Sequence, residues 1–240
     1  MVKSLVLLFL VSPLWAGEFG MYRTDNLVSY YKMNEGGGSV LNDSSLVLPT
    51  TATTSGTGQA WTIGFFGKAM DLDGSGGWVA QDTDKFNFRD WTFMCWVYLK
   101  SNTGGRRRIY NQQTTSDGSI YLGMAVNDGL LEVFSEKDAV VQAGVVPIPL
   151  RRWTHCAVTR KAGTHLAIYI NGKLDTKVAS TNSDQYNIVS DMGIGVLART
   201  GGELFIGSLD ELVALNKALS DGEIAGEYAR SLNRRTTLLQ

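Results

Sequence analysis

The stretch that most constrains the fold of this chain is residues 153–174, WTHCAVTRKAGTHLAIYINGKL. Side chains alternate between two faces over residues 153–159 and again over 165–170, which is the period of a half-buried β-strand. The Asn171-Gly172 pair that follows tolerates the positive φ angles of a type I′ turn, the strongest short-range hairpin signal. The stretch predicts a meander of antiparallel strands that the rest of the chain must cover.

Short strands separated by turn residues are predicted along most of the remaining chain. Residues 90–99 are apolar on both faces, which is typical of a central strand in a two-layer protein. Residues 49–59 are rich in Thr, Ser and Gly and are predicted to form a loop, and the two prolines of residues 145–150 predict a linker or an edge segment. Ser220 and Glu223 form a capping box that begins one short helix. We therefore expect an all-β, two-sheet antiparallel sandwich with one short C-terminal helix.

The N-terminus has the pattern of a secretory signal peptide. Lys3 precedes seven apolar residues, 5–11, and Ala16 is a small residue at a plausible cleavage position. Seven residues are too few to cross about 30 Å of hydrocarbon as a helix, so no membrane span is expected. We expect residues 1–16 to be a signal peptide, residues 17–240 to be a single domain, and the protein to be secreted and extracellular.

The charge balance argues against a polyanionic partner. The chain has 22 Lys and Arg against 23 Asp and Glu, a formal net charge of −1. A nearly neutral chain lacks the basic footprint of a nucleic-acid-binding protein, so no nucleic-acid partner is expected. Short arginine runs, such as residues 106–108, are interpreted as solvated ends of loops.

The two cysteines, Cys95 and Cys156, each fall in the middle of a predicted strand. Export to an oxidising compartment makes a disulfide between them possible. Two buried free thiols are the alternative, because cysteine is among the most frequently buried residue types.

Five short segments, in this order, carry a resemblance to a known family. They are residues 27–36 with 43–45, residues 69–75, residues 91–97, residues 153–158 with 169–172, and residues 205–211 with 218–224. The chain resembles the laminin-G-like members of the concanavalin A-like jelly-roll superfamily, with pentraxin features, over about residues 26–232. The resemblance implies a jelly roll, and it implies that Cys95 and Cys156 pair, because the corresponding strands of pentraxins carry a disulfide.

Catalysis is not expected. Related jelly-roll glucanases carry a carboxylate cluster on one strand, whereas no predicted strand here has three carboxylates at alternating positions. Asp71 and Asp73 run into a glycine-rich turn, where an Asp side chain caps its own backbone. A glycosidase needs two carboxyl groups at a fixed separation, which Asp71 and Asp73 in such a turn are not expected to provide. His155 is interpreted as a structural residue in a central strand.

A structural calcium ion is implied by the resemblance. Many jelly rolls of this superfamily bind one Ca²⁺ through a carboxylate on the last long strand and groups near the N-terminal strand. Asp210 matches the first position and Asp43 the second, and carbonyl groups and water would complete the six to eight oxygen ligands that Ca²⁺ takes. The alternative for Asp210 is a carboxylate that accepts hydrogen bonds from loop amides.

Carbohydrate binding would use exposed aromatic rings, and Trp61 and Tyr186 are the candidates because both lie in predicted polar loops. The leading hypothesis is a secreted, non-catalytic recognition domain that binds carbohydrate or another extracellular ligand. The alternative is a structural or assembly subunit that decorates a surface, matrix or particle through protein contacts.

Overall fold

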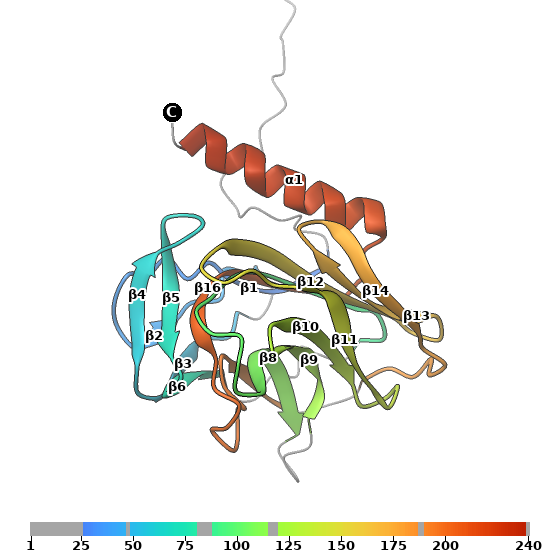
Figure 1. Ribbon diagram of the computed structural model, residues 1–240. Helices are drawn as coiled ribbons and strands as arrows, with labels where there is room; N and C mark the ends of the chain where they lie inside the picture. The colour runs from blue at the N-terminus through green and yellow to red at the C-terminus, as the bar shows by residue number, and fades with distance from the viewer. Residues whose placement is uncertain (1–25, 47–48, 81–87, 115–119, 187–189, 239–240) are drawn as a thin grey trace, which may run out of the picture.

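Two antiparallel sheets and one helix make up the fold in Figure 1, a computed structural model that describes residues 26–46, 49–80, 88–114, 120–186 and 190–238. Sheet A has the strand order β14-β13-β12-β7-β16-β5-β4, and β1 also pairs with β16. Sheet B has the order β11-β10-β9-β8-β15-β6-β3-β2. The predicted two-sheet jelly-roll sandwich is confirmed. The expected signal peptide, residues 1–16, lies outside the described residues.

The strands of sheet A are β1 (Leu27–Tyr31), β4 (Gln59–Ile63), β5 (Lys68–Asp73), β7 (Trp91–Leu99), β12 (Trp153–Lys161), β13 (His165–Ile170), β14 (Lys173–Ala179) and β16 (Ile206–Leu215). The strands of sheet B are β2 (Val40–Leu41), β3 (Ala52–Gly56), β6 (Gly76–Ala80), β8 (Arg106–Thr114), β9 (Ile120–Asn127), β10 (Leu130–Ser135), β11 (Val140–Pro147) and β15 (Ser190–Ile194). The helix is α1 (Asp221–Leu238).

The predicted meander is present as β12, β13 and β14. Asn171 and Gly172 between β13 and β14 have φ angles of 50° and 75°, as a type I′ turn requires. Strand β7 lies beside β12 in the middle of sheet A and is buried on both faces. Its inward side chains, including Phe93 and Val97, join the main core between the sheets. Its outward side chains, including Trp96, join a second apolar cluster.

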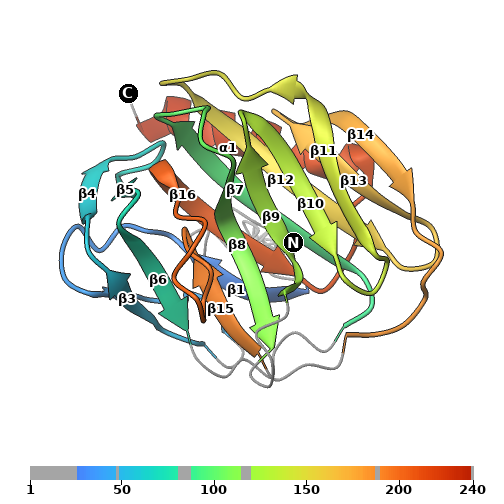
Figure 2. The ribbon, with the colours of Figure 1, turned by 60° about the horizontal axis from the view of Figure 1, so that its bottom comes forward.

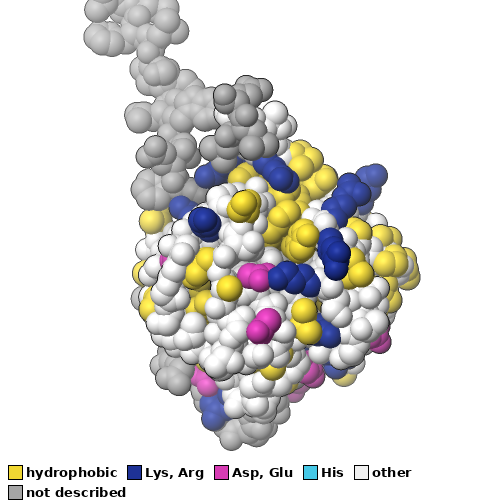
Figure 3. Space-filling view, turned by 60° about the vertical axis from the view of Figure 1, so that its left-hand side comes forward, with side chains coloured by type: hydrophobic (Ala, Val, Ile, Leu, Met, Phe, Trp, Pro, Cys, Tyr) yellow, Lys and Arg dark blue, Asp and Glu magenta, His cyan; other side chains and the backbone are white. Residues whose placement is uncertain are grey.

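Helix α1 crosses the outer face of sheet A and covers this second cluster (Figure 1). The predicted capping box is confirmed, because Ser220 N donates to Glu223 Oε2 at 2.9 Å and Glu223 N donates to Ser220 Oγ at 3.3 Å. Towards the end of the helix the guanidinium group of Arg235 lies 4.3 Å from the ring centroid of Phe65. Figure 3 shows basic side chains gathered near this end of the molecule with hydrophobic ones between them. No helix in the part of the chain that the structure describes has the length and apolar character to cross a membrane.

Two predictions about local structure are wrong. The Thr-rich stretch predicted as a loop contains β3 and begins β4, because Thr is β-branched and suits a pleated strand, with Ala52 packed into the core. Residues 106–108 lie within β8 and are not the end of a loop. The proline-containing stretch is confirmed as an edge, since β11 is the last strand of sheet B and ends at Pro147.

The predicted disulfide is not formed. Cys95 and Cys156 are direct cross-strand partners on β7 and β12, yet both are free, fully buried thiols. The Cys95 Sγ–H donates instead towards the main-chain oxygens of Trp96 and Asp210, at 3.3 and 3.4 Å. Burial raises the pKa of both thiols, so the unreactive protonated form is favoured.

This state of the cysteines predicts a simple labelling result. In the folded protein neither Cys95 nor Cys156 should react with Ellman's reagent, because both side chains are inaccessible and protonated. After unfolding in guanidinium chloride without reductant, both thiols should titrate. Absence of any titratable thiol in the unfolded chain, restored by prior reduction, would show a disulfide and contradict the structure.

Candidate functional site

The outer face of sheet B is the better candidate for a binding surface, because α1 already covers much of the outer face of sheet A (Figures 1 and 2). Two hollows open on sheet B. One lies between β8, β10 and β11, and the other lies beside β3 and β6. We call them the arginine pocket and the threonine groove.

A single row of paired residues connects the two hollows across sheet B. The row is made of Val141, Phe134, Gly123, Asn111, Gly193, Val79 and Thr53, one residue from each strand from β11 to β3. The row faces outward, because neighbouring positions such as Val133, Met124 and Met192 point into the main core. The arginine pocket includes Phe134 and Val141 at one end of the row, and the threonine groove includes Val79 and Thr53 at the other.

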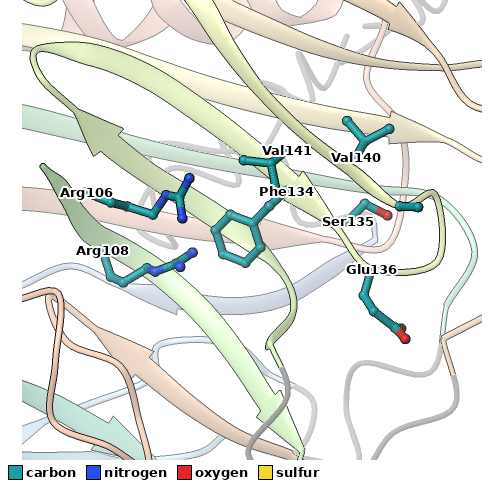
Figure 4. A pocket seen from close by; sticks show the side chains of 8 residues that line it. Arg106, Arg108, Phe134, Ser135, Glu136, Val140 and Val141 are labelled. Carbon is teal, nitrogen blue, oxygen red and sulfur yellow. The ribbon is translucent and has the colours of Figure 1, made fainter.

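The arginine pocket is a cavity of about 370 Å³ (Figure 4). Its lining residues are Arg106, Arg108, Phe134, Ser135, Glu136, Ala139, Val140 and Val141. Alternation along β8 places Arg106 and Arg108 on one face, and the turn between β10 and β11 supplies the rest of the wall. The pocket therefore combines guanidinium donors with an apolar wall.

Both arginines are fixed by carboxylates. The side chain of Arg108 is 3% exposed. Its Nε forms an ion pair with Glu203 Oε2 at 2.6 Å, although the two groups are not aligned for a hydrogen bond. The guanidinium carbon of Arg108 lies 4.3 Å from the ring centroid of Phe134. Arg106 Nε donates to Glu132 Oε2 at 2.5 Å, and this hydrogen bond raises the pKa of Arg106. Burial lowers the pKa of Arg108. Because each guanidinium group has its own carboxylate, the two arginines do not require an anionic ligand.

A buried ion pair fixes the turn that forms the pocket wall. Asp138, in the turn between β10 and β11, pairs with Arg160 of β12 at 2.5 Å, and both side chains are fully buried. Burial alone would raise the pKa of Asp138, but hydrogen bonds from Arg160, Ser135 and Ser180 outweigh it and lower the pKa. Removing one partner of such a pair typically costs about 3–5 kcal/mol. The pair makes the wall a preformed feature.

Tyr186 belongs to this buried network and is not exposed, which corrects its assignment as a ligand-binding residue. Its side chain is 0% exposed, its hydroxyl lies 2.5 Å from Ser135 Oγ, and Arg160 lies over its ring at 5.3 Å. A ring without exposed surface has no face for a sugar to stack on. Residues 181–185 form the predicted polar loop and are mostly exposed, but the side chain of Tyr186 points inward from that loop.

Trp61 lies elsewhere, on β4 at an edge of sheet A. It is half-buried, packs against the main core, and meets Trp78 edge-on with ring centroids 6.2 Å apart. The structure therefore does not bring Trp61 and Tyr186 together, and Trp61 lines neither hollow. Sequence reasoning missed Arg106 and Arg108, whose signal was the i, i+2 spacing of two arginines in a strand.

The two carboxylates proposed as calcium ligands both accept hydrogen bonds from backbone amides. Asp43 Oδ1 accepts from Tyr30 N at 2.9 Å and Ser45 N at 2.8 Å, and its Oδ2 accepts from Thr50 N at 3.2 Å. Both oxygens of Asp43 thus hold backbone amides, one of them in β1 and the others in the loop that contains Asp43. Among the described residues, no group of three or more His, Cys, Asp or Glu side chains is placed to hold a metal ion.

Asp210 is fully buried, and only one of its two carboxylate oxygens has a hydrogen-bond partner among the described residues. Its Oδ2 accepts from Phe66 N at 2.8 Å, while its buried Oδ1 has no hydrogen-bond partner among the described residues. Burial and then the charge of Glu211 raise the pKa of Asp210, and burial raises the pKa of Glu211 to about 7. The amide bond to Phe66 matches the alternative interpretation, in which Asp210 holds a loop.

The residues considered for catalysis have structural surroundings. Asp73 Oδ1 accepts from Ser75 N at 2.9 Å, which is the self-capping turn predicted from the sequence. Asp71 accepts from Lys100 Nζ and from Ser208 Oγ, both at 2.6 Å. His155 is fully buried next to Trp96, and burial lowers its pKa to about 4. None of the three lines the arginine pocket.

Several solved structures share the fold of this chain at low sequence identity. Domain 4 of AbnA, a GH43 extracellular arabinanase from Geobacillus stearothermophilus solved in complex with arabinotriose, is 19% identical, with a TM-score of 0.65 over 85% of this chain and 98% of that domain. A Trypanosoma rangeli sialidase mutant displaying trans-sialidase activity is 15% identical, with a TM-score of 0.68 over 89% of this chain and 34% of the other. The botulinum neurotoxin serotype G binding domain gives a TM-score of 0.62 at 15% identity, over 85% of this chain and 51% of that one.

These similarities concern the fold, and this chain spans only a third to a half of the last two proteins. No curated protein matches the sequence. A laminin-G-type family model, described as concanavalin A-like lectin/glucanases superfamily, matches residues 73–225, which is more than half of the chain. The chain therefore belongs to the concanavalin A-like lectin/glucanases superfamily.

Proposed function

We propose that this protein is a secreted, non-catalytic recognition domain that binds carbohydrate in the arginine pocket of sheet B. The observation that carries the proposal is the pair of charge-compensated guanidinium groups beside an apolar wall. Membership of a lectin-type superfamily supports it, and so does the solved complex of AbnA domain 4 with arabinotriose.

The chemistry of the pocket matches that of a sugar. A pyranose or furanose ring has hydroxyl groups around its edge and an apolar C–H face, so it needs directed polar groups next to an apolar surface. Arg106 offers N–H donors, Glu136 offers an acceptor, and Val140 and Val141 form the wall. Arg106 and Arg108 are already paired, so ligand binding does not require a carboxylate or phosphate on the sugar.

The same pocket supports the non-catalytic part of the proposal. Glycoside hydrolysis uses two carboxyl groups on opposite sides of the bond to be broken. Glu136 is the one carboxylate among the residues that line the described pocket, while Glu132 and Glu203 are engaged with arginines. A single carboxylate is sufficient for hydrogen bonding but not for this two-carboxylate chemistry.

The proposal predicts that Val141→Asp will abolish most carbohydrate binding, because it places an unpaired charge on the apolar wall. We expect at least a tenfold loss of affinity, about 1.4 kcal/mol, measured by calorimetry with arabinotriose as the first ligand and with any further hit from a glycan array. Val141 is 60% exposed, so folding should be unaffected. The matched control is Val145→Asp, because Val145 lies on the same strand, is 72% exposed, and does not line the pocket. Equal binding by both variants, or an array without hits, would contradict the proposal.

The alternative function, assembly through protein contacts, has one observation in its favour. Exposed apolar side chains cluster along β11 and β14, the neighbouring edge strands of the two sheets, and just beyond β11: Val141, Val145, Val146, Leu150 and Leu174. Exposed apolar edges are frequent sites of association.

Light scattering coupled to size-exclusion chromatography separates the two functions. The recognition domain should elute as a monomer whose mass does not change with concentration. A defined oligomer that dissociates in the Val145→Asp variant would support assembly and contradict the leading proposal.

The family resemblance predicts a calcium ion held by Asp210 and Asp43, whereas the hydrogen bonds of Asp43 are those of a carboxylate that caps backbone amides. We expect calcium at about 1 mM, the range of weak extracellular sites, to leave the melting temperature unchanged relative to excess EDTA. A rise in melting temperature with calcium that is lost in Asp210→Asn would show that Asp210 binds the ion with ligands other than Asp43.

A further inference from the structure

We propose that the threonine groove is a second carbohydrate subsite, and that the ligand of this protein is a neutral polysaccharide chain that reaches from the arginine pocket to the groove. This inference rests on the proposed function and extends it from a single sugar to a chain. It comes from the lining of the groove, the row of paired residues that joins it to the arginine pocket, and the loop that lies between them.

The groove is lined by hydroxyl groups. It has a volume of about 640 Å³, and its lining residues are Pro49, Thr50, Thr51, Thr53, Thr54, Ser55, Val79 and Ala198. Along β3 the outward positions Thr53 and Ser55 both carry a hydroxyl group, as does Thr51 just before the strand, while the inward Ala52 packs into the core.

The lining contains no charged side chain, which restricts the ligand class. A phosphate or carboxylate ligand would be recognised by arginine, lysine or a helix N-terminus, and none of these lines the groove. Hydroxyl groups both donate and accept hydrogen bonds, as sugar hydroxyls do. The groove is therefore suited to an uncharged polyol such as a neutral sugar unit.

One loop, residues 195–204, forms a ridge between the two hollows. Gly193 in the middle of the row makes room for it, because a Cβ atom there would lie 2.2 Å from the main-chain oxygen of Val196. Asn111 holds the loop by donating to that oxygen at 2.6 Å, and Gln113 holds it by accepting from Arg199 N at 2.8 Å.

The same loop contributes to both hollows. Ala198 lines the threonine groove, and Glu203 pairs with Arg108 in the arginine pocket. Figure 2 shows the loop that follows β15 in front of the strands of sheet B. The loop therefore lies between the two hollows, and a ligand that reaches both of them must cross it.

The spacing of the hollows sets the length of ligand required. From Phe134 on β10 to Thr53 on β3 the row crosses five strand-to-strand steps, which at the usual sheet spacing is about 24 Å. A disaccharide is too short to reach across this distance, whereas a hexasaccharide is long enough. Filling a second subsite on the same chain increases affinity without a second independent binding event.

The test compares arabinobiose and arabinohexaose by calorimetry on the full protein. In the unmodified protein we expect arabinohexaose to bind at least tenfold more tightly than arabinobiose. In the double variant Thr51→Val/Thr53→Val, which keeps side-chain shape and β-propensity but removes two hydroxyl groups, this gain should fall below threefold. Binding of arabinobiose should be unchanged in the double variant, because the arginine pocket is intact. The matched control is Thr176→Val, a threonine on β14 of the other sheet.

The outcomes separate the two proposals. Equal affinity for both oligosaccharides, or a length-dependent gain that survives in the double variant, overturns the second subsite but leaves the proposed function standing. Absence of binding by either oligosaccharide, with the protein folded by circular dichroism, counts against both proposals. Ser55→Ala provides an independent variant of the groove should the double variant be unstable, and it should reduce binding of arabinohexaose alone.

Discussion

Everything in this structure depends on the burial of both faces of strand β7. Phe93 and Val97 on its inner face pack against sheet B, and Trp96 on its outer face packs beneath α1. A central strand of this composition must be covered on both sides, since each large side chain left in water would forgo about 1.5–3 kcal/mol of burial. The helix is therefore part of the core of the domain, and it leaves the outer face of sheet B as the broad face open to a ligand (Figure 1).

On the outer face of sheet B, two glycines in the row of paired residues decide where the hollows lie. Gly123 and Gly193 sit in the outward row, where the ring of Phe134 and the loop after β15 occupy the space that a side chain would fill. Arg108 then lies over Phe134 and pairs with Glu203 of the same loop. The arginine pocket and the threonine groove are what remains on either side of the ridge. Their contrasting linings suit different parts of one polar, uncharged ligand.

The sandwich, the meander and the capped helix could be predicted from the sequence, because alternation, the Asn171-Gly172 turn and the capping box are local signals. The candidate site could not. Tyr186 follows exposed polar residues, which predicts a surface loop, but its own side chain turns inward and its hydroxyl group contacts Ser135, a partner of the buried Asp138–Arg160 pair. The Thr-rich stretch was predicted as a loop from its composition, although alternation of Thr53 and Ser55 about inward positions is the pattern of an exposed strand face. The inward position of Tyr186 depends on contacts with distant segments, and no local pattern encodes them.

The central claim is that carbohydrate binds on the outer face of sheet B. A crystal structure of the protein with arabinohexaose tests it most directly. The account predicts sugar density against Arg106 and Val141, continuing over the loop 195–204 towards Thr53. Sugar density seated instead beside Trp61 on sheet A, or against α1, with the outer face of sheet B empty, would contradict it.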